Sequence, residues 1–230
     1  TAYDYPQARA ADAAGVDMVL VGDSLAMVVL GHADTLSVTM DEMLHHVKAV
    51  RRGLSRALLI ADMPYGSFHL GLEPAVANAL RFVKEGGAAA VKIEGARIDV
   101  IEALVAAEIP VQAHLGLTPQ SIHVMGGYGV QGRRSDEARA LVEDAQALEE
   151  AGAFALVVEG VPLAVAVEVY RRGRTLACNA ELACSSEAAD RDQVPCPKKY
   201  GRYTAMPASG DAIESCLCRD YGSFDDLQHG

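Results

Sequence analysis

One pattern recurs along the first 172 residues: a short apolar run ends at a polar residue, and a segment with helical periodicity follows. The clear runs are residues 16–22 before Asp23, 57–61 before Asp62, 88–93 before Glu94, 111–113 before His114, and 154–158 before Glu159. Ala2 and Tyr3, before Asp4, are expected to form the end of an earlier strand. Short buried strands that alternate with helices predict a parallel sheet with helical crossovers.

Such a sheet either stays open and doubly wound or closes into a (β/α)8 barrel. The polar residues favour the barrel, because they stand at the C-terminal ends of at least five strands, where barrel enzymes place their active sites. An open sheet concentrates its ligand at one switch point instead. The expected helices are 39–53, 74–86, 98–108 and 136–151. We therefore expect a TIM-type barrel of about six strand–helix units, with its last two strands not recognisable.

Three of the residues at strand ends are carboxylates: Asp23, Asp62 and Glu94. Hard oxygen ligands without Cys or interleaved His are typical of Mg2+, which keeps water and substrate in its remaining positions. The alternative is that each carboxylate only caps the helix or turn that follows it. For one residue alone, capping is the better interpretation, and for three at one rim the metal site is favoured.

Three further strand residues are candidates for chemistry. Lys92 and Glu94 are two apart in a strand, so they share a face, where Lys92 either meets a bound anion or forms a structural ion pair. Glu159 follows an apolar run, which favours a general base, although a capping or salt-bridged role is equally open. His114 either hydrogen-bonds a substrate oxygen or is a satisfied core histidine.

Residues 116–134 are rich in glycine and are expected to form a long rim loop that covers the site. Gly127 to Gly132 match G-x-G-x-x-G. The match is weak, because the motif does not lie directly between a strand and a helix. No phosphate-binding P-loop and no hydrolase elbow occur in the sequence.

The composition changes near residue 173. All five cysteines follow this point, and residues 173–230 contain no adjacent Val, Ile or Leu residues, so no buried parallel strand is expected there. The cysteine spacings match no zinc knuckle, and their odd number argues against a disulfide framework. We expect a site-bearing domain at 1–172 and an irregular, poorly ordered tail at 173–230. The cysteines are Cys178, Cys184, Cys196, Cys216 and Cys218.

The formal net charge of −11 argues against nucleic acid or an anionic membrane as a partner. No apolar run reaches the ~18 residues of a membrane span, and no secretion signal opens the chain, so a cytoplasmic location is expected. The chain starts at Thr1 within a strand-like run, which suggests an N-terminus that is cut or incomplete.

Several segments, in order and spacing, resemble the ketopantoate hydroxymethyltransferase family. The most specific is His114-Leu-Gly-Leu-Thr-Pro-Gln-Ser121, followed by Gly126-Gly-Tyr128 and Val130-Gln-Gly132. The resemblance covers residues 1–172. Its other segments are Thr1-Ala-Tyr-Asp4, Val21-Gly-Asp-Ser-Leu25, Gly31-His32, Ala61-Asp-Met-Pro64, Val91-Lys-Ile-Glu-Gly95, and Glu159 with Val161-Pro162.

The resemblance implies a (β/α)8 barrel, Mg2+, and hydroxymethyl transfer from the co-substrate 5,10-methylenetetrahydrofolate to 2-oxoisovalerate in pantothenate synthesis. It also implies a homo-oligomer, decameric in the family. By position, it implies the following roles: Asp23, Asp62 and Glu94 at the metal; Asp23, Ser24, Asp62, Lys92 and His114 at the substrate; and Glu159 as the base.

The chain departs from the family at both ends. The family's segment before the first strand, and its strands after the sixth, are not recognisable here, which suggests a reading-frame shift or a splice near residue 173. Six strands would leave a barrel open, so low stability and much reduced activity are expected. Two other functions stay open: another magnesium-dependent keto-acid aldolase or lyase of this barrel type, and a truncated product without catalysis.

Overall fold

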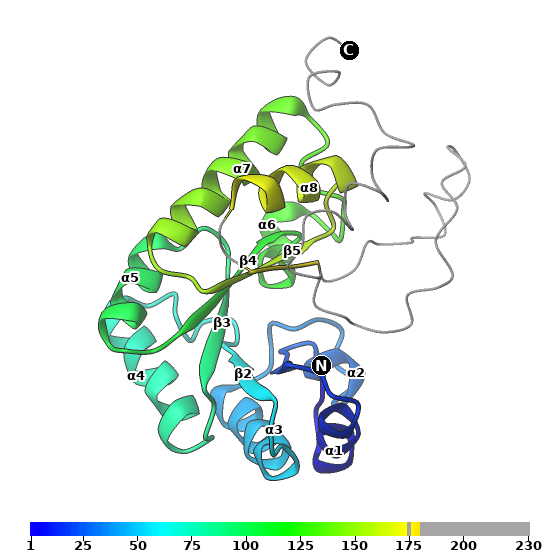
Figure 1. Ribbon diagram of the computed structural model, residues 1–230, viewed down its shortest axis with the longest axis vertical. Coiled ribbons are helices and arrows are strands. Elements are labelled where there is room, and N and C mark those ends of the chain that lie inside the picture. Colours follow the sequence, from blue (N-terminus) through cyan, green and yellow to red (C-terminus); the bar gives the residue numbers. More distant parts are fainter. Residues whose placement is uncertain (174–175, 180–230) are drawn as a thin grey trace, which may run out of the picture.

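Six parallel strands form one curled sheet in a computed structural model of the chain, which describes residues 1–173 and 176–179. Each strand pairs with the next in sequence, in the order β1-β2-β3-β4-β5-β6. Helices follow one another around the outer side of the curl (Figure 1). The strands are β1 (Met18–Val21), β2 (Leu58–Asp62), β3 (Ala90–Glu94), β4 (Val111–Gly116), β5 (Ala155–Glu159) and β6 (Leu176–Asn179).

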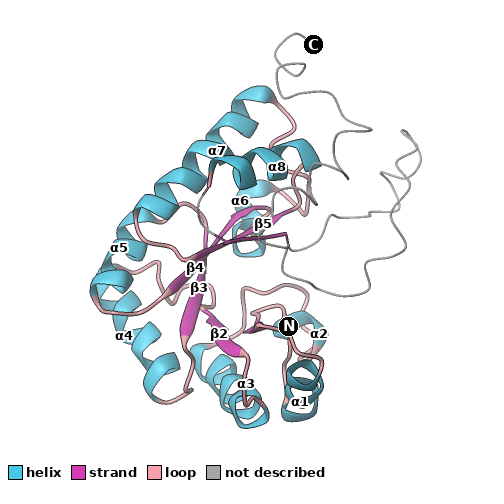
Figure 2. Ribbon diagram, viewed as in Figure 1, coloured by secondary structure: helices cyan, strands magenta, loops and turns pink. Residues whose placement is uncertain are grey.

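Most of the helices are the crossovers between consecutive strands, and Figure 2 shows the alternation of helix and strand. Within the described residues, no helix is both long and apolar enough to cross a bilayer. The helices are α1 (Tyr5–Ala13), α2 (Leu25–Val28), α3 (Met40–Gly53), α4 (Leu72–Lys84), α5 (Ile98–Ala106), the 3-10 turn η1 (Pro119–Ser121), α6 (Ile122–Met125), α7 (Ser135–Glu150) and α8 (Leu163–Arg172).

Local sequence explains where the longer helices begin and end. The Thr39 hydroxyl accepts a hydrogen bond from the Glu42 backbone N–H, and the Glu42 carboxylate accepts one from the Thr39 N–H, which is the predicted capping box of α3. Beyond the end of α7, Gly152 adopts a φ of +101°, a conformation that favours glycine. The four crossover helices expected from the sequence are all present, with ends shifted by a few residues.

The core lies between the sheet and the surrounding helices. Every residue of β3 and β4 is buried, because helices cover the outer face and side chains from neighbouring strands fill the inner face. Over the described ranges, β1 pairs with β2 alone and β6 with β5 alone, so the curl does not close. The prediction of an incomplete barrel of the (β/α)8 type is confirmed.

Two expectations about the strands are wrong. Ala2 and Tyr3 form no strand, although the Ala2 N–H donates to the Leu20 carbonyl at 3.0 Å beside β1. The sixth strand is instead β6, which lies within the segment where no strand was expected and pairs in parallel with β5. Parallel pairing uses backbone groups that any non-proline residue supplies, so a run without adjacent aliphatic residues can still join the sheet.

The segment 116–134 is less irregular than expected, because it contains η1 and α6. Gly126 ends α6 in the left-handed conformation at a φ of +74°. Of the tail, the structure describes Gly173 and β6. The predictions of an irregular remainder and of unpaired cysteines at 184, 196, 216 and 218 lie outside the described residues, and the domain division remains a prediction.

Asp12 joins α1 to the start of β2. Its carboxylate accepts hydrogen bonds from the backbone N–H groups of Ser55, Arg56 and Ala57 at 3.1, 3.0 and 2.9 Å. These hydrogen bonds, with that of Ala57 the most important, lower the pKa of Asp12 below its ordinary value. Three bonds to one carboxylate fix where the chain enters β2, the strand that ends at Asp62.

We expect Asp12→Ala to lower the melting temperature, and Asp12→Asn to lower it less, because the amide oxygen still accepts hydrogen bonds. Because the folded-state pKa is depressed, the stabilisation by charge is present above the unfolded pKa of about 4 and is lost as the pH falls below it. Thermal melts of the wild type and Asp12→Asn from pH 7 to pH 3 measure this. The difference between the two melting temperatures should shrink over the acidic part of the range. A constant difference would show that the charge of Asp12 does not contribute to stability.

Candidate active site

The parallel register places the candidate site residues at paired positions of neighbouring strands. Asp62 pairs with Lys92 across β2 and β3, and Glu94 pairs with His114 across β3 and β4. Across β4 and β5, Gly116 pairs with Glu159. Asp23 lies two residues beyond the end of β1. Polar residues at the C-terminal ends of five neighbouring strands therefore meet at one edge of the sheet, as the sequence pattern predicts.

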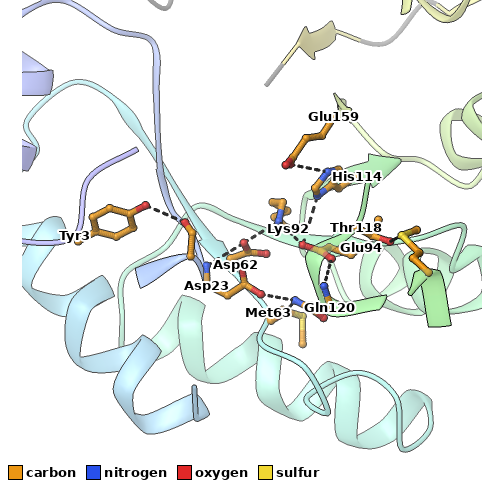
Figure 3. Close-up of polar contacts among 12 residues, drawn as sticks. Tyr3, Asp23, Asp62, Met63, Lys92, Glu94, His114, Thr118, Gln120 and Glu159 are labelled. Atoms are coloured by element: carbon orange, nitrogen blue, oxygen red, sulfur yellow. Dashed lines mark hydrogen bonds and ion pairs between the residues drawn. The ribbon is translucent and has the colours of Figure 1, made fainter. Parts of the chain in front are cut away.

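Three buried carboxylates surround one buried ammonium group (Figure 3). Lys92 Nζ donates to Asp62 Oδ2 at 2.7 Å and lies 3.3 Å from Glu94 Oε1. The backbone N–H of Asp23 donates to Asp62 Oδ2 at 3.1 Å. One oxygen from each of Asp23, Asp62 and Glu94 lies within 4.8 Å of the others. The three predicted metal ligands form one cluster, which we call the carboxylate triad.

Burial and mutual repulsion disturb the ionisation of the triad. Burial, followed by the charge of Asp62, raises the pKa of Asp23 to about 8. Burial also raises the pKa of Asp62, against the opposing effect of Lys92. Glu94 behaves differently: burial acts to raise its pKa, but Lys92 and His114 outweigh burial and lower the pKa to about 2. Three carboxylates facing one ammonium group would carry an excess of negative charge if all were ionised, and the raised pKa values of Asp23 and Asp62 show that protonation relieves it.

His114 links the triad to Glu159 (Figure 3). Its Nδ1 lies 3.5 Å from Glu94 Oε1, and its Nε2 lies 3.2 Å from Glu159 Oε2. These are ion-pair separations without well-aligned hydrogen bonds. Burial and the charge of Lys92 lower the pKa of His114, but the two carboxylates outweigh them, and the pKa is raised. The Glu159 side chain is 25% exposed, so it is more open to solvent than His114 or Glu94.

Ser24 lies next to Asp23, but its side chain contacts another partner. The hydroxyl groups of Ser24 and Tyr3 are 2.8 Å apart, and the Tyr3 carbonyl lies 2.6 Å from Nδ1 of His46 on α3. The segment before α1 therefore reaches the predicted site through a tyrosine that was not among the predicted site residues. In the sequence, Tyr3 was noted as part of an expected strand end and of the family resemblance, without a role at the site.

Gln120, in η1, was also not predicted as a site residue. Its side-chain amide donates to Asp23 Oδ2 and to the Met63 carbonyl, each at 2.9 Å, and its backbone N–H donates to Glu94 Oε2 at 3.0 Å. No periodicity or spacing in the sequence points to this residue, because its partners come from three other strand ends. Its place in the His114–Ser121 segment was the one available signal.

The triad fits a hard divalent cation. It offers carboxylate oxygens without nitrogen or sulfur, a donor set typical of Mg2+. Asp62 Oδ1 is buried and has no hydrogen-bond partner among the described residues. A cation would satisfy this oxygen and neutralise the excess negative charge, which Lys92 alone does not balance. The arrangement is therefore compatible with Mg2+.

Solved structures with similar folds are distant in sequence. A putative phosphonomutase from Burkholderia cenocepacia J2315 matches with a TM-score of 0.62 and 16% identity, over 82% of this chain and 80% of that chain. A 2,3-dimethylmalate lyase of the PEP mutase/isocitrate lyase superfamily matches with a TM-score of 0.56 and 21% identity, over 76% of this chain and 63% of that chain. These likenesses support the barrel-type fold alone.

Curated relatives are much closer in sequence. The 3-methyl-2-oxobutanoate hydroxymethyltransferase of Geobacillus sp. (strain WCH70) is 56% identical over 174 residues, which cover 75% of this chain and 62% of that protein. The enzyme of the same name from Koribacter versatilis (strain Ellin345) is 58% identical over 171 residues, covering 74% of this chain and 58% of that protein. The chain thus spans about three fifths of the length of these relatives.

A family profile described as ketopantoate hydroxymethyltransferase matches residues 1–178, which include all the predicted site residues and all but the last residue of β6. The match covers well over half of the chain, and it agrees with the relatives in naming one kind of transferase. The chain therefore belongs to the ketopantoate hydroxymethyltransferase family.

Proposed function

We propose that the described residues build the keto-acid half of a hydroxymethyltransferase site, which acts on 2-oxoisovalerate (3-methyl-2-oxobutanoate) with 5,10-methylenetetrahydrofolate as the one-carbon donor. The observation that carries the proposal is the line of contacts from the carboxylate triad through His114 to Glu159. This line of contacts would join the cation site to the carboxylate that acts as the base, at one edge of the sheet. The names of the close relatives supply the substrate and the transferred group.

The chemical problem is the weak acidity of C3 in a 2-keto acid. Removal of its proton leaves negative charge that spreads to the 2-oxo oxygen, so the site needs a base on one side of the substrate and positive charge on the other. Asp23, Asp62 and Glu94 would hold Mg2+, which would act as a Lewis acid toward the oxygens of the keto acid. Asp23 and Asp62, as part of the triad, would thereby also orient the substrate.

Each remaining residue has a role that follows from its position. Lys92, buried between Asp62 and Glu94, adds positive charge beside the substrate oxygens. Glu159 takes the proton from C3. Water converts the methylene bridge of the folate to formaldehyde with release of tetrahydrofolate, and C3 then bonds to the formaldehyde carbon while its oxygen takes up a proton to give the hydroxymethyl group. His114 lies against Glu159 and holds that carboxylate toward the triad. Ser24 lies next to Asp23, and its hydroxyl, 2.8 Å from that of Tyr3, would contact the substrate carboxylate.

The two alternatives, an aldolase or lyase and a product without catalysis, can be told apart from the transferase. A magnesium-dependent aldolase or lyase of the same barrel type would share the triad, but identities of 52–58% link this chain to hydroxymethyltransferases. A product without catalysis would keep the same residues and show no turnover. The half-reaction at C3 separates a catalytic chain from one without catalysis, because it needs the base and the cation but no folate, and the folate half-reaction then separates the transferase from an aldolase or lyase.

We expect the chain to catalyse deuterium exchange at C3 of 2-oxoisovalerate in D2O when Mg2+ is present. Glu159→Gln should slow this exchange at least 100-fold, the lower range for loss of a general base. Proton NMR of the substrate follows the exchange directly. The exposed Glu102 on α5 provides the matched control, and Glu102→Gln should exchange at the wild-type rate.

Exchange that proceeds equally without Mg2+, or equally in Glu159→Gln, would contradict the proposed mechanism. Absence of exchange from a folded wild-type chain in the presence of Mg2+ would favour the product without catalysis. Addition of tetrahydrofolate and formaldehyde then tests the second half-reaction, with ketopantoate as the expected product.

We expect Lys92→Met to destabilise the chain by about 3 kcal/mol in the absence of divalent cations, because it leaves buried carboxylates without their ammonium partner. Urea denaturation followed by circular dichroism measures the change in the free energy of unfolding. The exposed Lys84 on α4 is the control, and Lys84→Met should change stability little. Unchanged or increased stability of Lys92→Met would show that Lys92 does not balance the charge of the triad.

A further inference from the structure

Gln120 contacts two members of the carboxylate triad with different parts of the same residue (Figure 3). Its side-chain Nε2 donates to Asp23 Oδ2, and its backbone N–H donates to Glu94 Oε2. The second acceptor of Nε2 is the Met63 carbonyl, directly after Asp62. Because both side-chain partners are acceptors, the NH2 group of the amide must face them, and Oε1 must point elsewhere.

The residue is almost fully buried, with 5% of its surface exposed, and Oε1 has no hydrogen-bond partner among the described residues. An unpaired buried amide oxygen is costly. Asp62 Oδ1, in the same cluster, is also buried without a hydrogen-bond partner among the described residues. The waters that Mg2+ keeps when bound to the triad would satisfy Asp62 Oδ1, since each water donates two hydrogen bonds.

The rim segment, residues 117–131, reaches the site at three places. At its ends, the Leu117 N–H donates to the Glu159 carbonyl at 2.7 Å, and the Gln131 N–H donates to the Gly160 carbonyl at 2.8 Å. Gln120 is the residue of this segment whose hydrogen bonds reach the triad. The outer part of the segment is exposed, with Val124 92% exposed. The packing of this segment is therefore coupled to the triad through one residue.

We propose that Gln120 is a positioning residue of the cation site, which orients Asp23 and Glu94 and couples cation binding to the docking of the rim segment. The inference rests on the cation site of the proposed function. A donor that hydrogen-bonds to one oxygen of a metal-ligating carboxylate fixes the direction of the other oxygen. It thereby raises the affinity of the site for the metal. By linkage, a cation that orders the carboxylates of Asp23 and Glu94 also strengthens their hydrogen bonds with Gln120. Cation binding therefore stabilises the packing of the rim segment.

The first test measures Mn2+ affinity of the full chain by electron paramagnetic resonance, with Mn2+ as the spectroscopic replacement for Mg2+. Gln120→Met keeps the length of the side chain and removes the side-chain donor to Asp23, while the backbone donor to Glu94 remains, and it should weaken Mn2+ binding about 10- to 100-fold. Gln131→Met is the matched control in the same segment, because the Gln131 amide donates to the Gly129 carbonyl and to no carboxylate. It should bind Mn2+ as the wild type does.

The second test begins with the wild-type chain. Mg2+ should slow backbone hydrogen–deuterium exchange across residues 117–131, and this protection should be weaker in Gln120→Met, which loses the contact with Asp23 and keeps the backbone contact with Glu94. Exchange across 117–131 that is unaffected by Mg2+ would overturn the coupling, even if Gln120→Met fails to fold.

The outcomes separate this inference from the proposed function. If the wild type binds Mn2+ and exchanges C3, but Gln120→Met binds Mn2+ equally well, the inference alone is wrong. If Gln120→Met weakens binding while the wild type catalyses no exchange at C3, the inference stands and the proposed function is wrong. A wild-type chain that binds no Mn2+ overturns both.

Discussion

The contacts of Lys92 with Asp62 and Glu94 connect side chains that come from neighbouring strands. Burial makes this cluster costly, because three carboxylates and one ammonium group are each almost fully buried. The register of β2 and β3 places Asp62 and Lys92 side by side. Gln120 donates hydrogen bonds to Asp23 and Glu94, and His114 lies 3.5 Å from Glu94. Without Lys92, the strand ends would carry repelling charges in the core.

The backbone at the end of β4 allows Glu159 to join this cluster through His114. Gly116 adopts a φ of +88°, and a Cβ at this position would lie 2.1 Å from the Glu159 carbonyl oxygen. The end of β4 can therefore approach the end of β5 closely enough for His114 to meet Glu159. Glu159 and the triad are thus held at the ends of strands of one sheet rather than by long loops, which limits how far they can move relative to one another.

Much of this arrangement was predictable from the sequence, because parallel strands bring their C-terminal ends to one edge. Asp23, Asp62 and Glu94 follow buried runs, so their proximity follows from the strand–helix alternation. Gln120 was not predictable in the same way, because its contacts depend on how η1 folds back over three strand ends. β6 was missed because its pairing depends on the neighbouring β5 rather than on aliphatic residues of its own.

If the triad and Lys92 form a site where a cation and a keto acid bind together, each should strengthen the binding of the other. Isothermal titration calorimetry of 2-oxoisovalerate, with and without Mg2+, measures this coupling. We expect the keto acid to bind with Mg2+ present and at least tenfold more weakly without Mg2+, and we expect Asp62→Asn to remove this dependence. Equal binding with and without Mg2+, unchanged by Asp62→Asn, would contradict this coupling.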